Sequence, residues 1–314
     1  MNKHIEENLN YYISQKDPEY AILLSGKWGS GKTFFIDKYI EHYPKNQNIK
    51  FIKISLFGLK KLDSIDEQIF QELHPILGSK YTKFAGSIFK GALKLGINID
   101  IDSDNKPDGK ASINLSDLNI FSNDGEKYSP KELIFIFDDL ERTDIEISEI
   151  LGYINYFVEQ SNFKVIILAN EEKIDKDEKF KEFKEKVIGK TFEVKQNFDE
   201  VLTHFLNLTT ESKTILETNK QSIKDVYLKA GYENLRHVRQ SILDFNYLYQ
   251  MIDKEYQKNN QFIERFIYVF FALSIEVKKG ELVIDEFIYH GKNPWQGISL
   301  SNSEKKKKLE LKKF

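Results

Sequence analysis

The chain alternates between short apolar runs and longer segments in which apolar residues recur at helical spacing. The apolar runs predict strands at 20–25, 49–57, 133–137, 164–170 and 191–194. The amphipathic segments predict helices over 3–15, 34–40, 63–77 and 147–157, and a further helix that ends at 186. Runs without polar interruption, such as 133–137, are typical of strands covered on both faces. The alternation therefore predicts an α/β fold in three layers, with helices on both sides of a parallel sheet.

Two segments depart from this alternation. In 78–130, glycines punctuate a weak helical pattern, and two alternating runs flank the turn-forming residues 105–109. This pattern predicts a β-hairpin within an insertion into the α/β fold. From 199 onward the pattern predicts only helices. We therefore expect an α/β core domain over 1–198, which contains the 78–130 insertion, and an all-helical domain over 199–314.

Composition and charge exclude several classes of protein. Of the 314 residues, 40% are hydrophobic, which argues against a disordered chain. Cysteine is absent, so disulfides and thiolate metal sites are excluded, and the six histidines lack metal-ligand spacing. A net charge of -3, without a basic stripe carrying interleaved aromatic residues, leaves nucleic-acid binding unsupported. No segment reaches the ~20 apolar residues of a membrane helix and no apolar signal core opens the chain, so we expect a cytoplasmic protein without an integral membrane segment.

A phosphate-binding loop motif, G-x-x-x-x-G-K-T, occupies 26–33. Successive backbone N–H groups of such a loop point at the β-phosphate of a nucleotide, and the following helix N-terminus adds a positive dipole. Lys32 is expected to reach the β- and γ-phosphates, and the Thr33 hydroxyl to ligate Mg²⁺. The predicted strand before the loop and the helix after it give the motif the context that it requires. The residues expected to contact the nucleotide are Gly26, Trp28, Gly29, Ser30, Gly31, Lys32, Thr33 and Phe34.

Hydrolysis also requires a metal ligand and a group that orients water, and an acidic cluster directly follows the strand at 133–137. Asp138 ends that strand at the edge of the sheet where ligands bind, and it is expected to hold Mg²⁺ through water. Asp139 is the preferred candidate for polarising the attacking water, and Glu141 competes for that role. In the purely structural alternative, the cluster caps the following helix.

Three polar residues are further candidates, each with a structural alternative. Arg142 is a candidate for stabilising charge on the γ-phosphate, within one subunit or across an interface; the alternative is a surface ion pair with Glu141 or Asp144. Asn170 is a candidate sensor of water or the γ-phosphate, and the alternative is a cap for the next helix. Arg236 begins a helix of the helical domain, from which a lid can reach the phosphates; the alternative is a solvated charge.

Together these residues resemble the KAP family of P-loop ATPases, relatives of the AAA+ class, over roughly residues 1–275. The matching segments are Gly-Lys-Trp-Gly-Ser-Gly-Lys-Thr at 26–33, Phe-Asp-Asp-Leu-Glu-Arg at 137–142, Ile-Leu-Ala-Asn-Glu-Glu-Lys-Ile at 167–174 and Asn-Leu-Arg at 234–236. Two features depart from the family pattern. Glu141 replaces the usual aspartate, and the 78–130 insertion is too polar for the membrane helices that family members often carry between their two Walker motifs.

The resemblance implies a molecular switch that binds and hydrolyses ATP with Mg²⁺. In bacteria, relatives of this kind are often implicated in anti-phage defence, as ATP-driven switches that assemble with an effector. The resemblance thus implies a homo-oligomer, a separate effector protein, or both. Two other functions remain as alternatives. One is a small-molecule or nucleotide kinase, whose arginine-rich lid the insertion lacks; the other is a catalytically weak ATP-binding scaffold, against which intact Lys32, Thr33 and Asp138 argue.

Overall fold

The computed structural model describes residues 2–45, 47–73, 132–160, 163–174, 176–232 and 234–282. The insertion and hairpin expected at 78–130 lie outside these residues, as does the end of the helix predicted over 63–77. The chain divides into two compact units, the first ending at Asn197 and the second beginning at Phe198.

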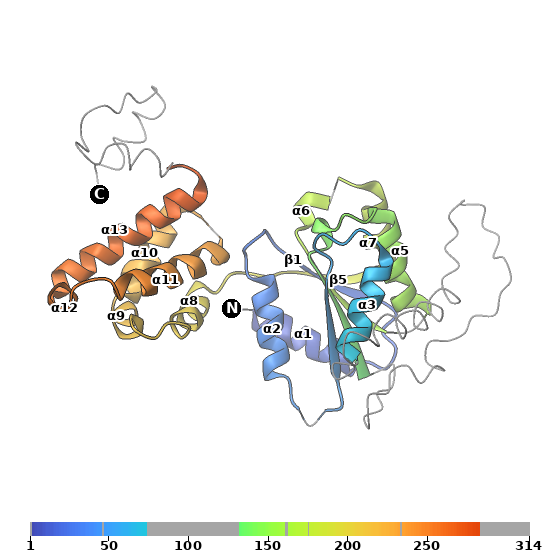
Figure 1. The fold of residues 1–314 in the computed structure, drawn as a ribbon. Helices are drawn as coiled ribbons and strands as arrows, with labels where there is room; N and C mark the ends of the chain where they lie inside the picture. Colours follow the sequence, from blue (N-terminus) through green and yellow to red (C-terminus); the bar gives the residue numbers. More distant parts are fainter. Residues whose placement is uncertain are drawn as a thin grey trace. The chain divides into compact units, whose positions relative to one another are not determined.

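Five parallel strands form the sheet of the first unit, in the order β2-β3-β4-β1-β5 (Figure 1). The strands are β1 (Ala21–Ser25), β2 (Lys50–Ser55), β3 (Leu133–Asp138), β4 (Lys164–Ala169) and β5 (Ile188–Glu193). The parallel sheet predicted from the sequence is confirmed. Because β4 lies between β1 and β3, the segments that follow these three strands are neighbours at the carboxyl edge of the sheet.

The last strand begins earlier than the sequence predicts, at Ile188 instead of Thr191. β5 stands at the end of the strand order and pairs with β1, and its residues alternate between half-buried and exposed positions. An edge strand whose residues are at most half-buried accommodates polar residues such as Lys190. The prediction followed the apolar residues alone and therefore missed the first half of the strand.

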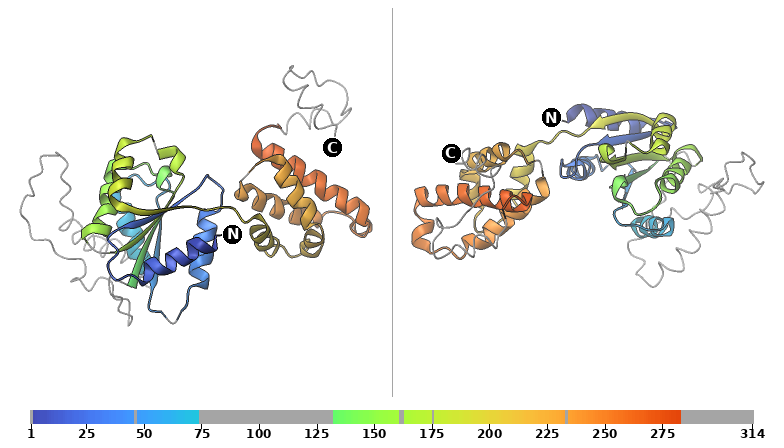
Figure 2. Two further views of the ribbon diagram at one scale, coloured as in Figure 1. Left: turned by 180° about the vertical axis from the view of Figure 1, so that it is seen from behind. Right: turned by 90° about the horizontal axis from the view of Figure 1, so that it is seen from above.

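Helices cover both faces of this sheet, as the sequence predicts (Figures 1 and 2). Two helices pack against one face, α1 (Lys3–Ser14) and α2 (Lys32–His42). Three pack against the other, α3 (Leu62–Leu73), α5 (Ile147–Asn155) and α7 (Glu178–Val187). A π-helical turn, η5 (Tyr156–Gln160), extends α5, and the short helix α6 (Glu171–Ile174) precedes α7.

Alternate residues of the central strands supply the two cores. In β1, Ile22 and Leu24 join the core beneath α1 and α2, whereas Ala21 and Leu23 join the core beneath α3, α5 and α7. All four side chains are fully buried. Burial of a large aliphatic side chain stabilises a fold by about 1.5–3 kcal/mol. The apolar runs that predict these strands therefore reflect burial on both faces.

The second unit is helical in all of its described elements, as predicted. Its helices are α8 (Phe198–Leu206), α9 (Lys213–Thr218), α10 (Lys220–Ala230), α11 (Leu235–Tyr249), α12 (Lys254–Gln257) and α13 (Asn260–Lys279). Buried Phe245 of α11 packs on Phe271 of α13, with ring centroids 5.8 Å apart. Across the described parts of the chain, no helix combines the length and the hydropathy that crossing a bilayer demands.

Candidate functional site

The loop between β1 and α2 is shaped by two glycines with left-handed backbone conformations. The φ angle is 77° at Gly29 and 94° at Gly31, values that residues with a Cβ rarely adopt. Gly31 directly precedes α2, so the unpaired N–H groups of the helix N-terminus open toward the loop. The Gly26 N–H donates to the carbonyl of Ala169 over 3.2 Å, which fixes the loop beside the end of β4. This geometry suits an anion.

Lys32 begins α2, and its side chain turns back into the loop. The ammonium donates to the carbonyl oxygens of Gly26 (2.6 Å) and Lys27 (3.2 Å), and the residue is only 6% exposed. Burial lowers the pKa of Lys32, while the negative charges of Glu141 and then Asp138 oppose that shift. The ammonium is therefore held by neutral carbonyls, which phosphate oxygens can replace with stronger, charge-assisted hydrogen bonds.

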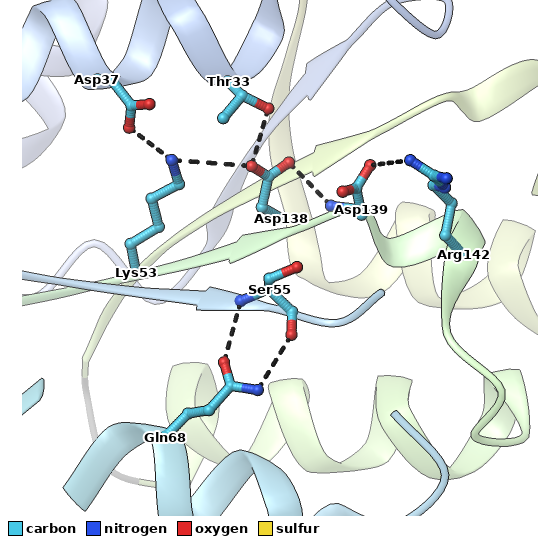
Figure 3. A network of polar contacts seen from close by, with 8 residues as sticks. All are labelled: Thr33, Asp37, Lys53, Ser55, Gln68, Asp138, Asp139 and Arg142. Carbon is cyan, nitrogen blue, oxygen red and sulfur yellow. Dashed lines mark hydrogen bonds and ion pairs between the residues drawn. The ribbon is translucent and has the colours of Figure 1, made fainter. Parts of the chain in front are cut away.

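Asp138 ends β3 and faces Thr33 of α2 (Figure 3). Thr33 Oγ1 donates to Asp138 Oδ2 over 2.9 Å, and the backbone N–H of Asp139 donates to Oδ1 over 2.9 Å. Asp138 is 4% exposed. This burial raises the pKa of its carboxyl group, although the Thr33 hydrogen bond and the charge of Lys53 act in the opposite direction.

The Thr33 hydroxyl and the Asp138 carboxylate fit a magnesium ion. Both are oxygen ligands of the kind that Mg²⁺ prefers, and they lie within hydrogen-bonding distance of each other. Within the described residues, no group of three or more histidine, aspartate or glutamate side chains could enclose a metal ion. Mg²⁺ at nucleotide sites usually takes one or two protein oxygens and completes its shell with phosphates and water, so the pair is sufficient.

Lys53 of β2 joins this pair, although nothing in the sequence predicts a role for it. Its ammonium contacts Asp37 Oδ1 of α2 at 2.5 Å and lies 4.0 Å from Asp138 Oδ2 (Figure 3). The one available signal is that Lys53 stands between the buried Ile52 and Ile54 in a strand. That alternation is equally typical of a lysine on a solvated face, so only the structure identifies its acidic partners.

Asp139 and Arg142 face each other in the turn after β3 (Figure 3). Asp139 has a left-handed backbone, with φ of 59°, which turns the chain into the 3-10 helix η4 (Leu140–Arg142). Arg142 Nη1 lies 3.8 Å from Asp139 Oδ1, and its guanidinium lies 4.0 Å from the ring centroid of Phe57. The ion pair of Arg142 is thus formed with Asp139, and not with the partners that the sequence suggested.

Glu141 connects this turn to the phosphate loop. The indole N–H of Trp28 donates to Glu141 Oε1 over 2.5 Å. Trp28 is 49% exposed, and the cationic groups of Arg142 and Lys173 lie 5.6 and 5.1 Å from its ring centroid. The aromatic residue within the loop therefore contacts both the acidic turn after β3 and the helix after β4.

Asn170 directly follows β4 and is 4% exposed. Its side-chain oxygen has no hydrogen-bond partner among the described residues, so this oxygen does not cap α6. β4 is flanked by β1, which leads into the phosphate loop, and by β3, which ends in Asp138. Asn170 consequently emerges between the two halves of the candidate site.

Unpaired polar atoms gather at this edge of the sheet. In the part of the chain that the structure describes, four buried side-chain atoms lack a hydrogen-bond partner, and three come from the segments after β1, β3 and β4. These three are Ser30 Oγ, Glu141 Oε2 and Asn170 Oδ1; the fourth is Asn155 Oδ1 on α5. Buried polar atoms are nearly always hydrogen-bonded in native proteins, so such a cluster indicates a site for a ligand or water.

The sequence also predicted nucleotide contacts at Phe34 and Arg236. Phe34 follows Thr33 on α2 and is half-buried. Arg236 belongs to the second unit, where it is exposed at the start of α11 and its backbone N–H donates to Asn234 Oδ1 over 3.1 Å. The contacts described above all join residues of the first unit.

Comparison with known proteins agrees with this geometry. The KAP family P-loop domain matches residues 2–252, which is more than half of the chain. The chain belongs to the KAP family of P-loop domains. Membership confirms the resemblance inferred from the motifs, and it supports nucleotide binding by the loop at 26–33.

Two of the solved structures similar to this KAP protein are proteins of Pyrobaculum aerophilum and Pyrococcus abyssi. Cdc6p from Pyrobaculum aerophilum shares 15% sequence identity at a TM-score of 0.47, with 80% of this chain and 62% of that chain covered. The KAP chain thus spans less than two thirds of the length of that protein. A Walker-type ATPase of Pyrococcus abyssi shares 16% identity at a TM-score of 0.35, with 80% of this chain and 75% of that chain covered. No curated protein matches the KAP chain.

Proposed function

We propose that this KAP protein binds ATP with Mg²⁺ and hydrolyses it to ADP and phosphate. The observation that carries the proposal is that the buried Lys32 ammonium and three unpaired polar atoms belong to segments that follow neighbouring strands of the sheet. The three atoms are those of Ser30, Glu141 and Asn170. The Ser30 hydroxyl is a donor suited to a phosphate oxygen. The other two atoms are acceptors suited to the two protons of a water molecule. A site with both features is equipped for hydrolysis.

In the proposed complex, phosphate oxygens become the acceptors of the Lys32 ammonium in place of the Gly26 and Lys27 carbonyls. Hydrogen bonds between charged groups are roughly twice as strong as neutral ones, which favours the exchange. Thr33 and Asp138 hold Mg²⁺, which when bound neutralises phosphate charge and orients the β- and γ-phosphates.

The reaction transfers the γ-phosphoryl group to water. A water oxygen bonds to the γ-phosphorus, the bond from that phosphorus to the bridging oxygen of ADP breaks, and a water proton passes to a carboxylate. Asp139 and Glu141 are the two carboxylates available after β3 for this proton. Asn170 orients the water, and Arg142 is proposed to stabilise charge as ADP leaves.

The proposal extends to a switch cycle. ATP binding brings the helical domain onto the core as a lid, with Arg236 as a phosphate contact, and it favours a homo-oligomer or the binding of a separate effector protein. Hydrolysis resets the switch. The assembly, the role in bacterial antiviral defence and the cytoplasmic location all rest on the family resemblance.

Products formed from ATP labelled in its γ-phosphate distinguish this proposal from the kinase and scaffold alternatives. The purified full-length protein is expected to release labelled inorganic phosphate, and the Lys32→Ala variant is expected to release none above the buffer blank. Label transferred to a cellular acceptor instead of water would support a kinase. ATP that is bound but stays intact would support a scaffold.

A further inference from the structure

We infer that Glu141, and not Asp139, accepts the proton of the attacking water, and that Trp28 positions the Glu141 carboxylate through its indole N–H. The inference rests on the proposed ATP hydrolysis and assigns the role that the sequence leaves open between two acids. It makes Glu141 a catalytic residue and Trp28 a positioning residue.

The two oxygens of Glu141 differ in a way that suits a general base. Oε1 accepts the Trp28 N–H over 2.5 Å, which fixes the orientation of the carboxylate. Oε2 is buried and has no hydrogen-bond partner within the described residues, so its capacity to accept a proton or a hydrogen bond is unused.

Asp139 has a different environment. Its left-handed backbone directs the side chain toward Arg142, whose Nη1 lies 3.8 Å from Oδ1 (Figure 3). The ion pair engages Asp139 Oδ1, whereas Glu141 Oε2 has no partner within the described residues. Asp139 thus serves to hold Arg142 and to turn the chain into η4.

Trp28 links the phosphate loop to the base. Its indole N–H is committed to Glu141, while the ring faces the cationic groups of Arg142 and Lys173. Half of the side chain is exposed, so it contributes little to the core. Because Trp28 belongs to the loop that binds the phosphates, its hydrogen bond sets the carboxylate in register with the γ-phosphorus. Misplacement of a catalytic group by about 1 Å can slow a reaction about 100-fold.

In the proposed step, the water oxygen bonds to the γ-phosphorus as the bond to the ADP bridging oxygen breaks. The water proton passes to Glu141 Oε2, and it leaves to solvent after phosphate is released, which restores the carboxylate. Asn170 Oδ1, the other unpaired acceptor, takes the hydrogen bond of the second water proton.

Steady-state kinetics of full-length variants test the assignment. Glu141→Gln is expected to lower kcat about 100-fold or more, as loss of a general base does. Trp28→Phe keeps the ring but removes the N–H, and it is expected to lower kcat about tenfold with KM for ATP changed less than about twofold. In the double variant, Trp28→Phe is expected to add less than about twofold to the loss from Glu141→Gln, since both act on one carboxylate.

Two control variants isolate the hydrogen bond. Tyr11→Leu removes an exposed ring that faces the Lys190 ammonium on another part of the first unit, and it is expected to keep kcat within about twofold. Asp139→Asn is expected to lower kcat less than about tenfold. Full activity of Glu141→Gln beside an inactive Asp139→Asn would overturn the inference while leaving ATP hydrolysis intact. Absence of turnover in the unmodified protein would instead overturn the proposed function, and the catalytic role of Glu141 with it.

A measurement without turnover tests the Trp28 contact itself. In a Trp295→Phe background, Trp28 is the only tryptophan, because the chain has two. Glu141→Gln is then expected to shift the Trp28 emission spectrum of the nucleotide-free protein, since a charged acceptor of the indole N–H is lost. Asp144→Asn, at an exposed position, is expected to leave the spectrum unchanged. Identical spectra for Glu141→Gln and the background protein would contradict the contact.

Discussion

At the residue scale, the site keeps two opposite charges buried. Lys32 and Asp138 are both less than one tenth exposed. Burial lowers the pKa of Lys32 and raises the pKa of Asp138, so it favours the uncharged form of each side chain. Such desolvation destabilises a fold, and groups perturbed in this way cluster at functional sites. Mg²⁺ and ATP phosphates supply the missing counter-charges, so we expect nucleotide binding and stability of the first unit to be coupled.

Replacement of Lys32 tests the binding half of this coupling. Lys32→Ala is expected to weaken ATP binding about tenfold to 100-fold, because hydrogen bonds to charged groups contribute about 1.5–3 kcal/mol. Titration with a fluorescent ATP analogue measures this. Lys27→Ala is the control: its carbonyl contacts Lys32, but its side chain is exposed. Equal affinity of Lys32→Ala and the unmodified protein would contradict the binding site.

The raised pKa of Asp138 predicts a pH-dependent stability. Native protein binds more protons than unfolded protein between the ordinary aspartate pKa of 3.8 and the raised native pKa of Asp138, so stability falls as pH rises through this window. Asp138→Asn removes the buried charge and is expected to raise the unfolding midpoint at pH 7, without nucleotide, by about 2–4 °C. The gain is expected to disappear in acid. Asp144→Asn, at an exposed position, should show no gain at either pH.

The sequence predicted the motifs of the candidate site, but it did not predict which side chains contact one another there. The spacing of the phosphate loop and the acids after 133–137 predicted Lys32, Thr33 and Asp138 because local sequence determines their backbone context. The hydrogen bond from Trp28 to Glu141 and the approach of Lys53 to Asp138 depend on which strands are neighbours. No local pattern in a single sequence indicates which strands are neighbours in the sheet.

At the scale of elements, hydrophobic periodicity predicted the buried strands and amphipathic helices of the described chain. It succeeded for β1, β3 and β4 because these strands are buried on both faces. It misplaced the start of β5 because that edge strand carries polar residues. The order of the strands, with β4 between β1 and β3, follows from packing between distant segments and not from periodicity.

The start of β5 also offers a test of close packing. A Cβ added at Gly189 would lie 2.4 Å from the ring of Tyr20, so Gly189→Ala is expected to destabilise the first unit by about 1–3 kcal/mol. At Gly152 in helix α5, an added Cβ would have no described atom within 4 Å apart from its chain neighbours and the backbone of the helix itself. Gly152→Ala is therefore expected to stabilise it by about 0.5–1 kcal/mol. Urea denaturation measures both, and equal effects of the two substitutions would contradict the packing of β5 against Tyr20.

At the scale of the whole molecule, the proposed switch predicts assembly that depends on ATP. The unmodified protein is expected to elute from a size-exclusion column as a larger species with ATP and Mg²⁺ than without nucleotide. Lys32→Ala should elute at one position in both conditions, because its loop binds the phosphates weakly. Identical elution of the unmodified protein with and without ATP would argue against assembly while leaving hydrolysis untouched.

The central claim is that the edge of the sheet after β1, β3 and β4 hydrolyses ATP with Mg²⁺. The most direct test is the rate of phosphate release from ATP by the purified full-length protein, measured with Mg²⁺ and again with EDTA. The account predicts turnover that requires Mg²⁺ and that Lys32→Ala abolishes. Phosphate release at the same rate in EDTA, or at the same rate by Lys32→Ala, would contradict it.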